Sequence, residues 1–146
     1  MNSDKTLRLV LGNQLFPIST HNFAENETVF MCEDLGLCSD VKHHKSKIAL
    51  FFSAMRSFRD ELEKNKINVI YYDYSNDFET DYCEKLIKTI FSNGIKKIVF
   101  FEIEDKLFEK KVLKSLDKHN IHFEQKTTPM FIDDRNSFND FCNEKD

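Results

Sequence analysis

The sequence predicts an α/β fold, in which a mainly parallel, five-stranded, Rossmann-like sheet is covered by helices on both faces. Short apolar runs recur along the chain, stretches of helical periodicity separate most of them, and the connections are short. Regular alternation of strand and helix requires crossover connections, which produce parallel sheets buried on both faces. We therefore expect a three-layer α/β domain over residues 1–132.

Five apolar runs are expected to form the strands, because most of them end at turn-forming or charged residues. They are Leu7–Leu11, Thr28–Cys32, Asn68–Tyr74, Lys96–Glu102 and the weaker Ile121–Glu124. The connection between the first two contains Pro17, Ser19 and Asn22. It is expected to be irregular, with one short helical turn.

The strongest helical pattern runs from about Val41 to Lys64. Its apolar residues recur every three or four positions, which predicts that this stripe faces the core. The stripe consists of Ile48, Phe51, Met55, Phe58 and Leu62. Two further helices are predicted over Tyr82–Ser92 and Lys106–His119, with stops at Asn93-Gly94 and at Lys118–Asn120.

The composition is that of a soluble globular domain, since 40% of the 146 residues are hydrophobic and 32% are charged. Fifteen Phe and no Trp predict an aromatic-rich core and remove a common electron-relay residue. A net charge of −4 gives no basic field for nucleic acid, so any DNA contact must be local or lie elsewhere. No apolar run approaches the ~20 residues that cross a bilayer, and no signal-peptide core follows the N-terminus. We therefore expect a cytoplasmic protein with no membrane contact.

The four cysteines do not point to a metal site. They are Cys32, Cys38, Cys83 and Cys142, and they form no C-x-x-C pair and no Cys/His cluster at zinc spacing. We expect reduced thiols that lie mostly in the core.

Candidate binding residues follow the first two strands. In an open parallel sheet, ligands bind beyond the carboxyl ends of the strands, near the point where the strand order reverses. Gly12, Asn13 and Gln14 follow the first strand, and Cys32 and Glu33 end or follow the second. Gly permits a positive φ or a close backbone approach, while the amides donate and accept hydrogen bonds but transfer no proton. The pattern favours binding over catalysis, and the absence of G-x-G-x-x-G argues against a dinucleotide site.

The turn before the long helix is basic, with His43 and His44 set among Lys42, Lys45 and Lys47. These residues could bind an anionic group at the helix N-terminus. Alternatively, the turn is solvated and one His is a hydrogen-bonding strut. Adjacent His residues point to different faces of a helix, so they are poor co-ligands for one metal. The sequence also contains no nucleophile elbow and no His-Glu-x-x-His motif.

Residues 133–146 have a different character from the preceding domain. After Pro129–Ile132, an amphipathic stub over Ser137–Cys142 carries Phe138 and Phe141. It is either a short docked helix or the start of a linker toward a C-terminal region. We expect the second.

The segment Val29–Leu62 resembles the signature region of the deoxyribodipyrimidine photolyase-related family, which includes iron–sulfur bacterial photolyases and cryptochromes. Members show a strand ending in Cys-Glu, followed by H-H-K-x-K-I-A and F-S-A-M-R-x-F. Here these positions are Cys32, Glu33, His43, His44, Lys45, Lys47, Ile48, Ala49, Phe52, Ser53, Ala54, Met55, Arg56 and Phe58. The opening LVLGNQL is similar to the family's strand with Gly-Asp-Gln-Leu, and a weaker likeness extends to the tail.

The resemblance implies an antenna domain of a light-driven DNA-repair flavoprotein. In relatives this domain can bind 6,7-dimethyl-8-ribityllumazine, which passes excitation to FAD in a helical C-terminal domain. That domain also holds a 4Fe-4S cluster and contacts DNA damaged by ultraviolet light. None of it is found in these 146 residues, so the chain alone should be catalytically silent. The implied pigment site comprises Gly12, Asn13, Gln14, Cys32, Glu33, Leu37, Asp40, His44 and Phe51.

Three departures from the family pattern affect this pigment site. Asn13 replaces an Asp, and Leu37 and Asp40 stand where pigment-binding relatives tend to show a Glu and a Tyr. Loss of a polar partner in a buried site costs ~1 to 3 kcal/mol. The alternative function is therefore a standalone binding or interaction module that kept the fold and lost the pigment. A flavodoxin-like enzyme using FMN would need a hydroxyl-rich phosphate loop, which the chain lacks.

Overall fold

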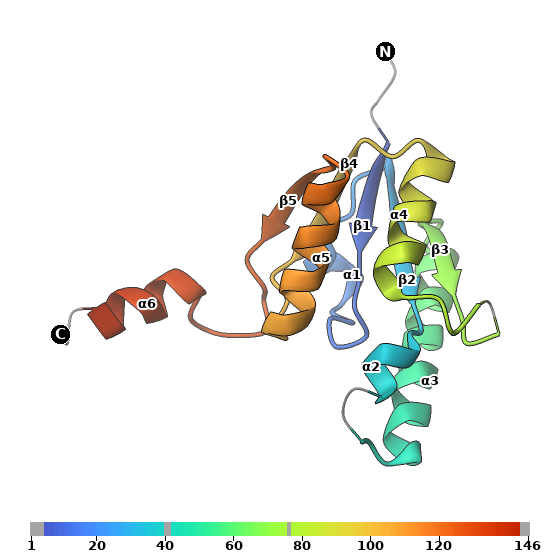
Figure 1. Ribbon diagram of the computed structural model, residues 1–146, viewed down its shortest axis with the longest axis horizontal. Helices are drawn as coiled ribbons and strands as arrows, with labels where there is room; N and C mark the ends of the chain where they lie inside the picture. Colours follow the sequence, from blue (N-terminus) through green and yellow to red (C-terminus); the bar gives the residue numbers. More distant parts are fainter. Residues whose placement is uncertain (1–4, 40–41, 76, 144–146) are drawn as a thin grey trace.

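The computed structural model describes residues 5–39, 42–75 and 77–143, and it contains a five-stranded, all-parallel sheet of order β3-β2-β1-β4-β5 (Figure 1). The strands are β1 (Thr6–Leu9), β2 (Glu27–Cys32), β3 (Asn68–Tyr72), β4 (Lys97–Phe101) and β5 (His122–Lys126). The helices are α1 (Ile18–His21), α2 (Leu35–Ser39), α3 (Lys45–Lys64), α4 (Tyr82–Asn93), α5 (Lys106–Lys118) and α6 (Arg135–Asn143). The predicted α/β fold and its parallel sheet are confirmed.

Alternation along the central strands produces two apolar layers, one on each face of the sheet. Leu7 and Leu9 of β1 and Phe30 of β2 belong to the cluster under α4 and α5, while Val29 and Met31 belong to the cluster under α3. Successive strand residues point to opposite faces, so a strand covered on both sides is apolar throughout. The three-layer arrangement follows from these runs.

One ion pair interrupts the apolar interior of the central strands. Arg8 of β1 is almost fully buried and donates to Glu27 of β2 at 2.9 Å. Two charges removed from water require this mutual contact, because either one alone would be left uncompensated. The pair joins β1 to β2 at the amino-terminal half of the sheet.

Helix α3 differs from its prediction in two ways. It begins at Lys45 and not near Val41, because His44 caps it and its Nδ1 accepts a hydrogen bond from the Ser46 N–H. Only Met55, Phe58 and Leu62 of the predicted core stripe are buried, whereas Phe51 is 36% exposed. The prediction that the whole stripe faces the core was therefore wrong for its first two turns.

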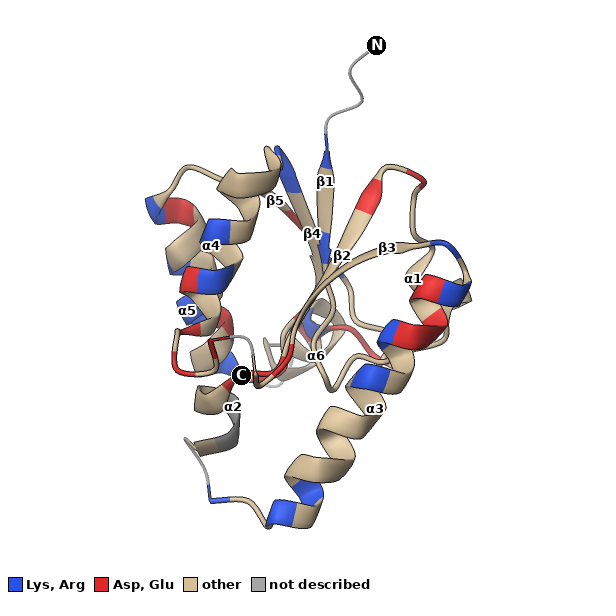
Figure 2. Cartoon of the chain, turned by 90° about the vertical axis from the view of Figure 1, so that its right-hand side faces the viewer, with Lys and Arg blue, Asp and Glu red and all other residues tan. Residues whose placement is uncertain are grey.

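The first turns of α3 are not covered because α3 is longer than the strands of the sheet. A helix of 20 residues is about 30 Å long, whereas a strand of five residues spans about 17 Å. Because α3 runs from the carboxyl edge of the sheet back to the amino edge, its N-terminal half extends beyond the carboxyl ends of the strands (Figures 1 and 2). Residues 45–54 are called the α3 overhang below.

The remaining elements lie within a few residues of their predicted bounds. The predicted stop at Gly94 is confirmed, since it caps α4 with a φ of 63°. Helix α1 is the expected short turn between the first two strands, while α2 was not predicted. In the described part of the chain, no helix has the length and hydropathy to cross a bilayer.

Helix α6 extends the predicted stub by two residues at its start and one at its end, and none of its residues is buried. Figure 1 shows it standing away from the sheet. Its first residue, Arg135, donates to a Glu109 carboxylate oxygen at 2.8 Å and to the Ile103 carbonyl at 2.5 Å. These contacts hold the base of α6 against the end of β4 and the start of α5.

Candidate functional site

The strand order reverses between β1 and β4, so the loops that follow these two strands face each other at the carboxyl edge of the sheet. Asn13 donates from Nδ2 to a Glu104 carboxylate oxygen at 3.0 Å. Gln14, which is almost fully buried, donates from Nε2 to the Glu102 carbonyl at 2.8 Å. The two predicted amides therefore tie these loops together.

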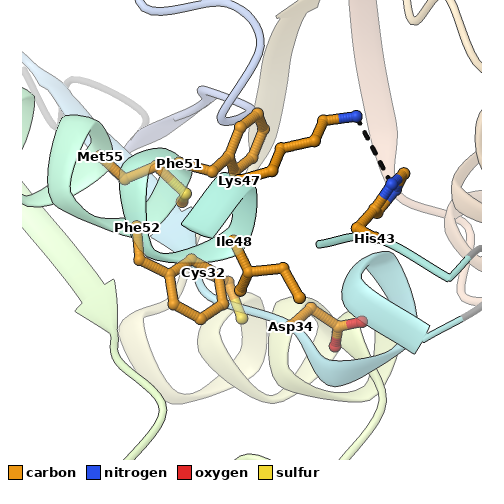
Figure 3. A pocket seen from close by; sticks show the side chains of 8 residues that line it. All are labelled: Cys32, Asp34, His43, Lys47, Ile48, Phe51, Phe52 and Met55. Atoms are coloured by element: carbon orange, nitrogen blue, oxygen red, sulfur yellow. Dashed lines mark hydrogen bonds between the residues drawn. The ribbon is translucent and has the colours of Figure 1, made fainter. Parts of the chain in front are cut away.

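The candidate site is a cavity of about 120 Å³ beside this crevice, between the end of β2 and the α3 overhang. Its lining residues are Cys32, Asp34, His43, Lys47, Ile48, Phe51, Phe52 and Met55 (Figure 3). The wall formed by α3 is mostly apolar, and the polar groups lie near its N-terminal end, where His43 Nδ1 is 3.5 Å from Lys47 Nζ. An apolar wall with a few polar groups is the usual composition of a small-molecule site.

Gly12 does not line the cavity, but its backbone closely approaches two side chains that do, Phe51 and Met55. A Cβ at this position would lie 2.2 Å from Phe51 Cε1 and 2.8 Å from Met55 Sδ. The left-handed backbone that would favour glycine is found at Gly94 and not here. Of the two reasons for a glycine that the sequence left open, the structure therefore selects close approach. The loop after β1 and the α3 overhang meet at this contact.

Glu33 fixes the position of α3 relative to the sheet. Its fully buried carboxylate accepts hydrogen bonds from Arg56 at 2.7 and 2.8 Å, from the Tyr71 hydroxyl at 2.7 Å and from the Tyr74 N–H at 2.9 Å. Burial alone would raise the pKa of Glu33, but the hydrogen bonds from Arg56, Tyr71 and Tyr74 outweigh it and the pKa is lowered. Glu33 is thus an ionised anchor whose oxygens are already engaged.

Cys32 lies at the cavity as a neutral thiol. Burial raises its pKa to about 12, and the nearby Lys85 ammonium only partly offsets this effect. A thiol that stays protonated is a poor nucleophile and a poor metal ligand. Among the described residues, no group of three or more His, Cys, Asp or Glu side chains is arranged to hold a metal ion. The cavity is suited to binding and not to covalent chemistry.

Of the predicted site, Cys32 and Phe51 line this cavity, and Gly12 lies against Phe51 without lining the cavity itself. Asn13, Gln14 and Glu33 lie at the same sheet edge but bond to other protein groups, and His44 caps α3. Leu37 belongs to α2, although its side chain is not described, and Asp40 lies outside the described residues.

The predicted pigment site did not include the cavity residues Asp34, His43, Lys47, Ile48, Phe52 and Met55, although the basic turn with His43 and Lys47 was considered as a separate anion site. A usable signal existed for part of this set. Residues 47, 48, 51, 52 and 55 follow a spacing of three and four, which places them on one helical face. Ile48, Phe51 and Met55 of this face were interpreted as core, because periodicity does not show where the sheet beneath the helix ends.

Residues 8–146 match the family described as deoxyribodipyrimidine photo-lyase-related protein. The chain belongs to this family. The resemblance noted from Val29–Leu62 is thereby confirmed, and the match includes every described residue of the candidate site.

A (6-4) photolyase from Agrobacterium fabrum (strain C58 / ATCC 33970) is 43% identical over 68 residues. The aligned segment covers 44% of this chain and 13% of that photolyase. The chain therefore shares a well-matched segment with a much longer enzyme, of which the match covers only a small part.

Proposed function

We propose that this chain is the α/β antenna domain of a photolyase-related flavoprotein and that the cavity beside Gly12 binds 6,7-dimethyl-8-ribityllumazine. Membership of the photolyase-related family supports the domain assignment. The observation that carries the ligand proposal is the cavity between the end of β2 and the α3 overhang. It lies where open parallel sheets bind ligands, at the carboxyl ends of the strands.

The residues of the cavity are chemically suited to a ribityl pteridine. The Phe52 and Phe51 rings and the Met55 thioether offer faces for a flat heterocycle. Asp34, His43 and Lys47 offer hydrogen-bonding groups for carbonyl oxygens and ribityl hydroxyls. The bound pigment would absorb light and pass the excitation energy to a flavin.

The cavity is smaller than the pigment needs, since small-molecule sites usually measure roughly 300–1,000 Å³ and this one measures about 120 Å³. Phe51 is the side chain that can enlarge it. Its ring is partly exposed and lies over Gly12, so an outward rotation would open space without disturbing the buried Met55. We therefore propose that Phe51 turns away from Gly12 when the pigment binds.

We assign none of the reaction chemistry of a photolyase to these 146 residues. Cys32 is protonated, and Glu33 is held in an ion pair. The FAD, the 4Fe-4S cluster and the contacts to damaged DNA that the resemblance implies are proposed to belong to a C-terminal domain. Repair of (6-4) photoproducts is likewise a proposal for a larger protein that contains this domain.

A second candidate is an interaction module of the same fold that no longer binds pigment. Two observations favour it: the carboxylate of Glu33 and the amide of Asn13 already bond to protein groups, and the cavity is small. Such a module would keep the α3 overhang as a contact surface and leave the cavity to packing.

Fluorescence titration with 6,7-dimethyl-8-ribityllumazine separates the two candidates, with riboflavin and FMN as competitors. We compare the unmodified chain with Phe51→Ala, which alters the cavity, and with Leu50→Ala. Leu50 is the neighbouring residue of α3, is 72% exposed and does not line the cavity, so it is the matched control. Circular dichroism verifies that each variant is folded.

Saturable binding that changes by about tenfold in Phe51→Ala, or roughly 1.4 kcal/mol, and not in Leu50→Ala would support the antenna assignment. Absence of saturable binding at high pigment concentration would favour the interaction module. Binding that both variants leave unaltered would place the pigment elsewhere and overturn the proposed site.

A further inference from the structure

A basic groove of about 580 Å³ runs between α4 and α5, on the face of the sheet opposite α3. Figure 1 shows the two helices side by side over this face. The charged and imidazole side chains that line the groove are Glu84, Lys88, Lys111, Lys114, Lys118 and His119. Positive charge is therefore concentrated here, although the whole chain has a net charge of −4. A contact with a polyanion has to be local in such a chain.

Three of the four lysines belong to one stripe of α5. Lys111, Lys114 and Lys118 are three and four residues apart, so their side chains leave the helix on the same side. Lys111 forms an ion pair with Asp81, which is the N-cap of α4. Within the described part of the chain, Lys88, Lys114 and Lys118 have no ion-pair partner. Three ammonium groups of the groove are thus available to an anionic ligand.

An exposed aromatic ring lies at one end of the groove. Phe91 follows Lys88 by three residues on α4 and is 64% exposed. The centroid of its ring is 6.1 Å from that of His119, which lines the groove. Proteins that bind single-stranded nucleic acid combine a positively charged groove for the phosphates with aromatic rings on which bases stack. Both elements are adjacent here.

The groove lies on the flank of α5 that faces away from α6. On the flank toward α4, Lys111 contacts Asp81. On the other flank, Glu109 bonds to Gln125 of β5 and to Arg135, the first residue of α6. Figure 1 shows α6 leaving on the β5 side, so any chain that follows α6 begins away from the groove. A protein surface that covered the groove would also have to neutralise its ammonium groups, because burial of an unpaired charge is strongly unfavourable.

We propose that the groove between α4 and α5 binds single-stranded nucleic acid, with its phosphates along the lysines and one base stacked on Phe91. A duplex offers the same phosphates, but it keeps the faces of its bases inside the helix. The contact reads no sequence, because every base has a π face and phosphates carry no sequence information. The groove is separate from the cavity beside α3 and from the contacts to damaged DNA that we assign to a C-terminal domain.

The salt dependence of binding follows from the number of phosphates that are contacted. Each phosphate of a single strand that a lysine neutralises contributes about −0.7 to the slope of log K against log salt concentration. The three unpaired lysines therefore predict a slope of about −2. The association constant should fall roughly twentyfold between about 50 and 200 mM salt.

Fluorescence anisotropy of a labelled single-stranded oligothymidylate, titrated with the chain at several salt concentrations, tests the lysines. Lys118→Gln should make the slope shallower by about 0.7, because one phosphate contact is lost. Lys64→Gln is the matched control. Lys118 and Lys64 are both exposed lysines in the last turn of a helix, but Lys64 belongs to α3 on the opposite face of the sheet. Its substitution should leave the slope unchanged.

The same titration tests the aromatic ring. Phe91→Ala should weaken binding at least about fivefold through the lost stacking, and it should leave the salt slope unchanged because no charge is removed. Phe138→Ala is the matched control, since Phe138 of α6 is also 64% exposed but lies away from the groove. Circular dichroism verifies that each variant is folded.

The proposal is overturned if the unmodified chain does not bind the oligonucleotide at low salt. It is equally overturned if Lys118→Gln and Lys64→Gln alter the slope to the same extent. A duplex that binds as tightly as the single strand, or binding that Phe91→Ala does not weaken, would indicate an unspecific anion-binding surface and would also contradict it.

Discussion

Gly12→Ala is the substitution that most directly tests how the loop after β1 meets α3. The added methyl would lie 2.2 Å from Phe51 Cε1, whereas carbon atoms in contact prefer about 3.5–4.0 Å. The ring must therefore retreat by more than about 1 Å. Because the obstructing atoms belong to the ends of the Phe51 and Met55 side chains, we expect a cost near the lower end of the ~1–3 kcal/mol of overpacking.

The effect of Gly12→Ala on the free energy of unfolding should change sign when Phe51 is replaced by alanine. A glycine replaced by alanine in a compatible backbone stabilises a protein by about 0.4–1 kcal/mol, because the unfolded chain loses freedom. Gly12 is not among the residues with a left-handed φ, so this gain should appear once the ring is gone and the Met55 thioether, 2.8 Å from the added methyl, has moved into the vacated space. Gly12→Ala should lower the free energy of unfolding by about 1 kcal/mol in the unmodified chain and raise it by about 0.5 kcal/mol in Phe51→Ala.

Urea unfolding followed by circular dichroism provides the four free energies of this double-mutant cycle. The expected coupling between positions 12 and 51 is about 1.5 kcal/mol, well above the ~0.3–0.5 kcal/mol within which independent sites add. Equal effects of Gly12→Ala in both backgrounds would show that Phe51 does not lie over Gly12. The cavity geometry described above would then be incorrect.

Three further outcomes follow from buried charges. Glu27→Gln should lower the free energy of unfolding by about 3–5 kcal/mol, because it leaves the buried Arg8 without its partner. Arg8→Met combined with Glu27→Leu removes both charges, so its free energy of unfolding in urea should lie within about 1 kcal/mol of the unmodified chain. Similar losses in both variants would contradict the ion-pair argument. Burial and the neighbouring Arg8 lower the pKa of His21 to about 4. Between pH 6.5 and pH 4 the unfolded state therefore binds more protons at this residue than the folded state does. The free energy of unfolding should drop by up to about 3 kcal/mol as the pH falls through that interval. His21→Phe should remove this part of the pH profile, and an unaltered profile would exclude His21 as its cause. Glu33→Gln should lower the free energy of unfolding by about 2 kcal/mol through weaker bonds to Arg56, while Arg56→Gln in the same background should add little; additive losses would show that the two do not act as a pair.

The sheet was predictable because β1, β2 and β4 are largely apolar on both faces, and the same runs identified many of the buried residues. The extension of α3 beyond the sheet could not be predicted. Its periodicity continues unchanged from Met55 to Ile48, and periodicity reports a helical face without reporting what covers it.

The candidate site was predictable only in part. Gly12 was identified because a glycine at the exit of a strand permits a positive φ or a close approach, and Cys32 because it ends a buried strand. The choice between His43 and His44 depended on where α3 begins, and a shift of one residue turns a side chain by about 100°. The partners of Glu33 could not be foreseen, because Arg56 and Tyr71 reach it from distant parts of the chain.

Helix α3 is supported unevenly along its length, and this has a consequence for its motions. Its C-terminal half is held in place by Phe58, Leu62 and the bond between Arg56 and Glu33, whereas its N-terminal part extends about 16 Å from Arg56 to Lys45 with little beneath it. Because only the C-terminal half of α3 is packed against the sheet, a small rotation of that half moves the N-terminal end of the helix by a larger distance. Amide hydrogen exchange should therefore be slow near Leu62 and accelerate toward Lys45. A molecule bound to the N-terminal end of α3 would slow that exchange and would restrict the motion of the side of the cavity that contains Phe51.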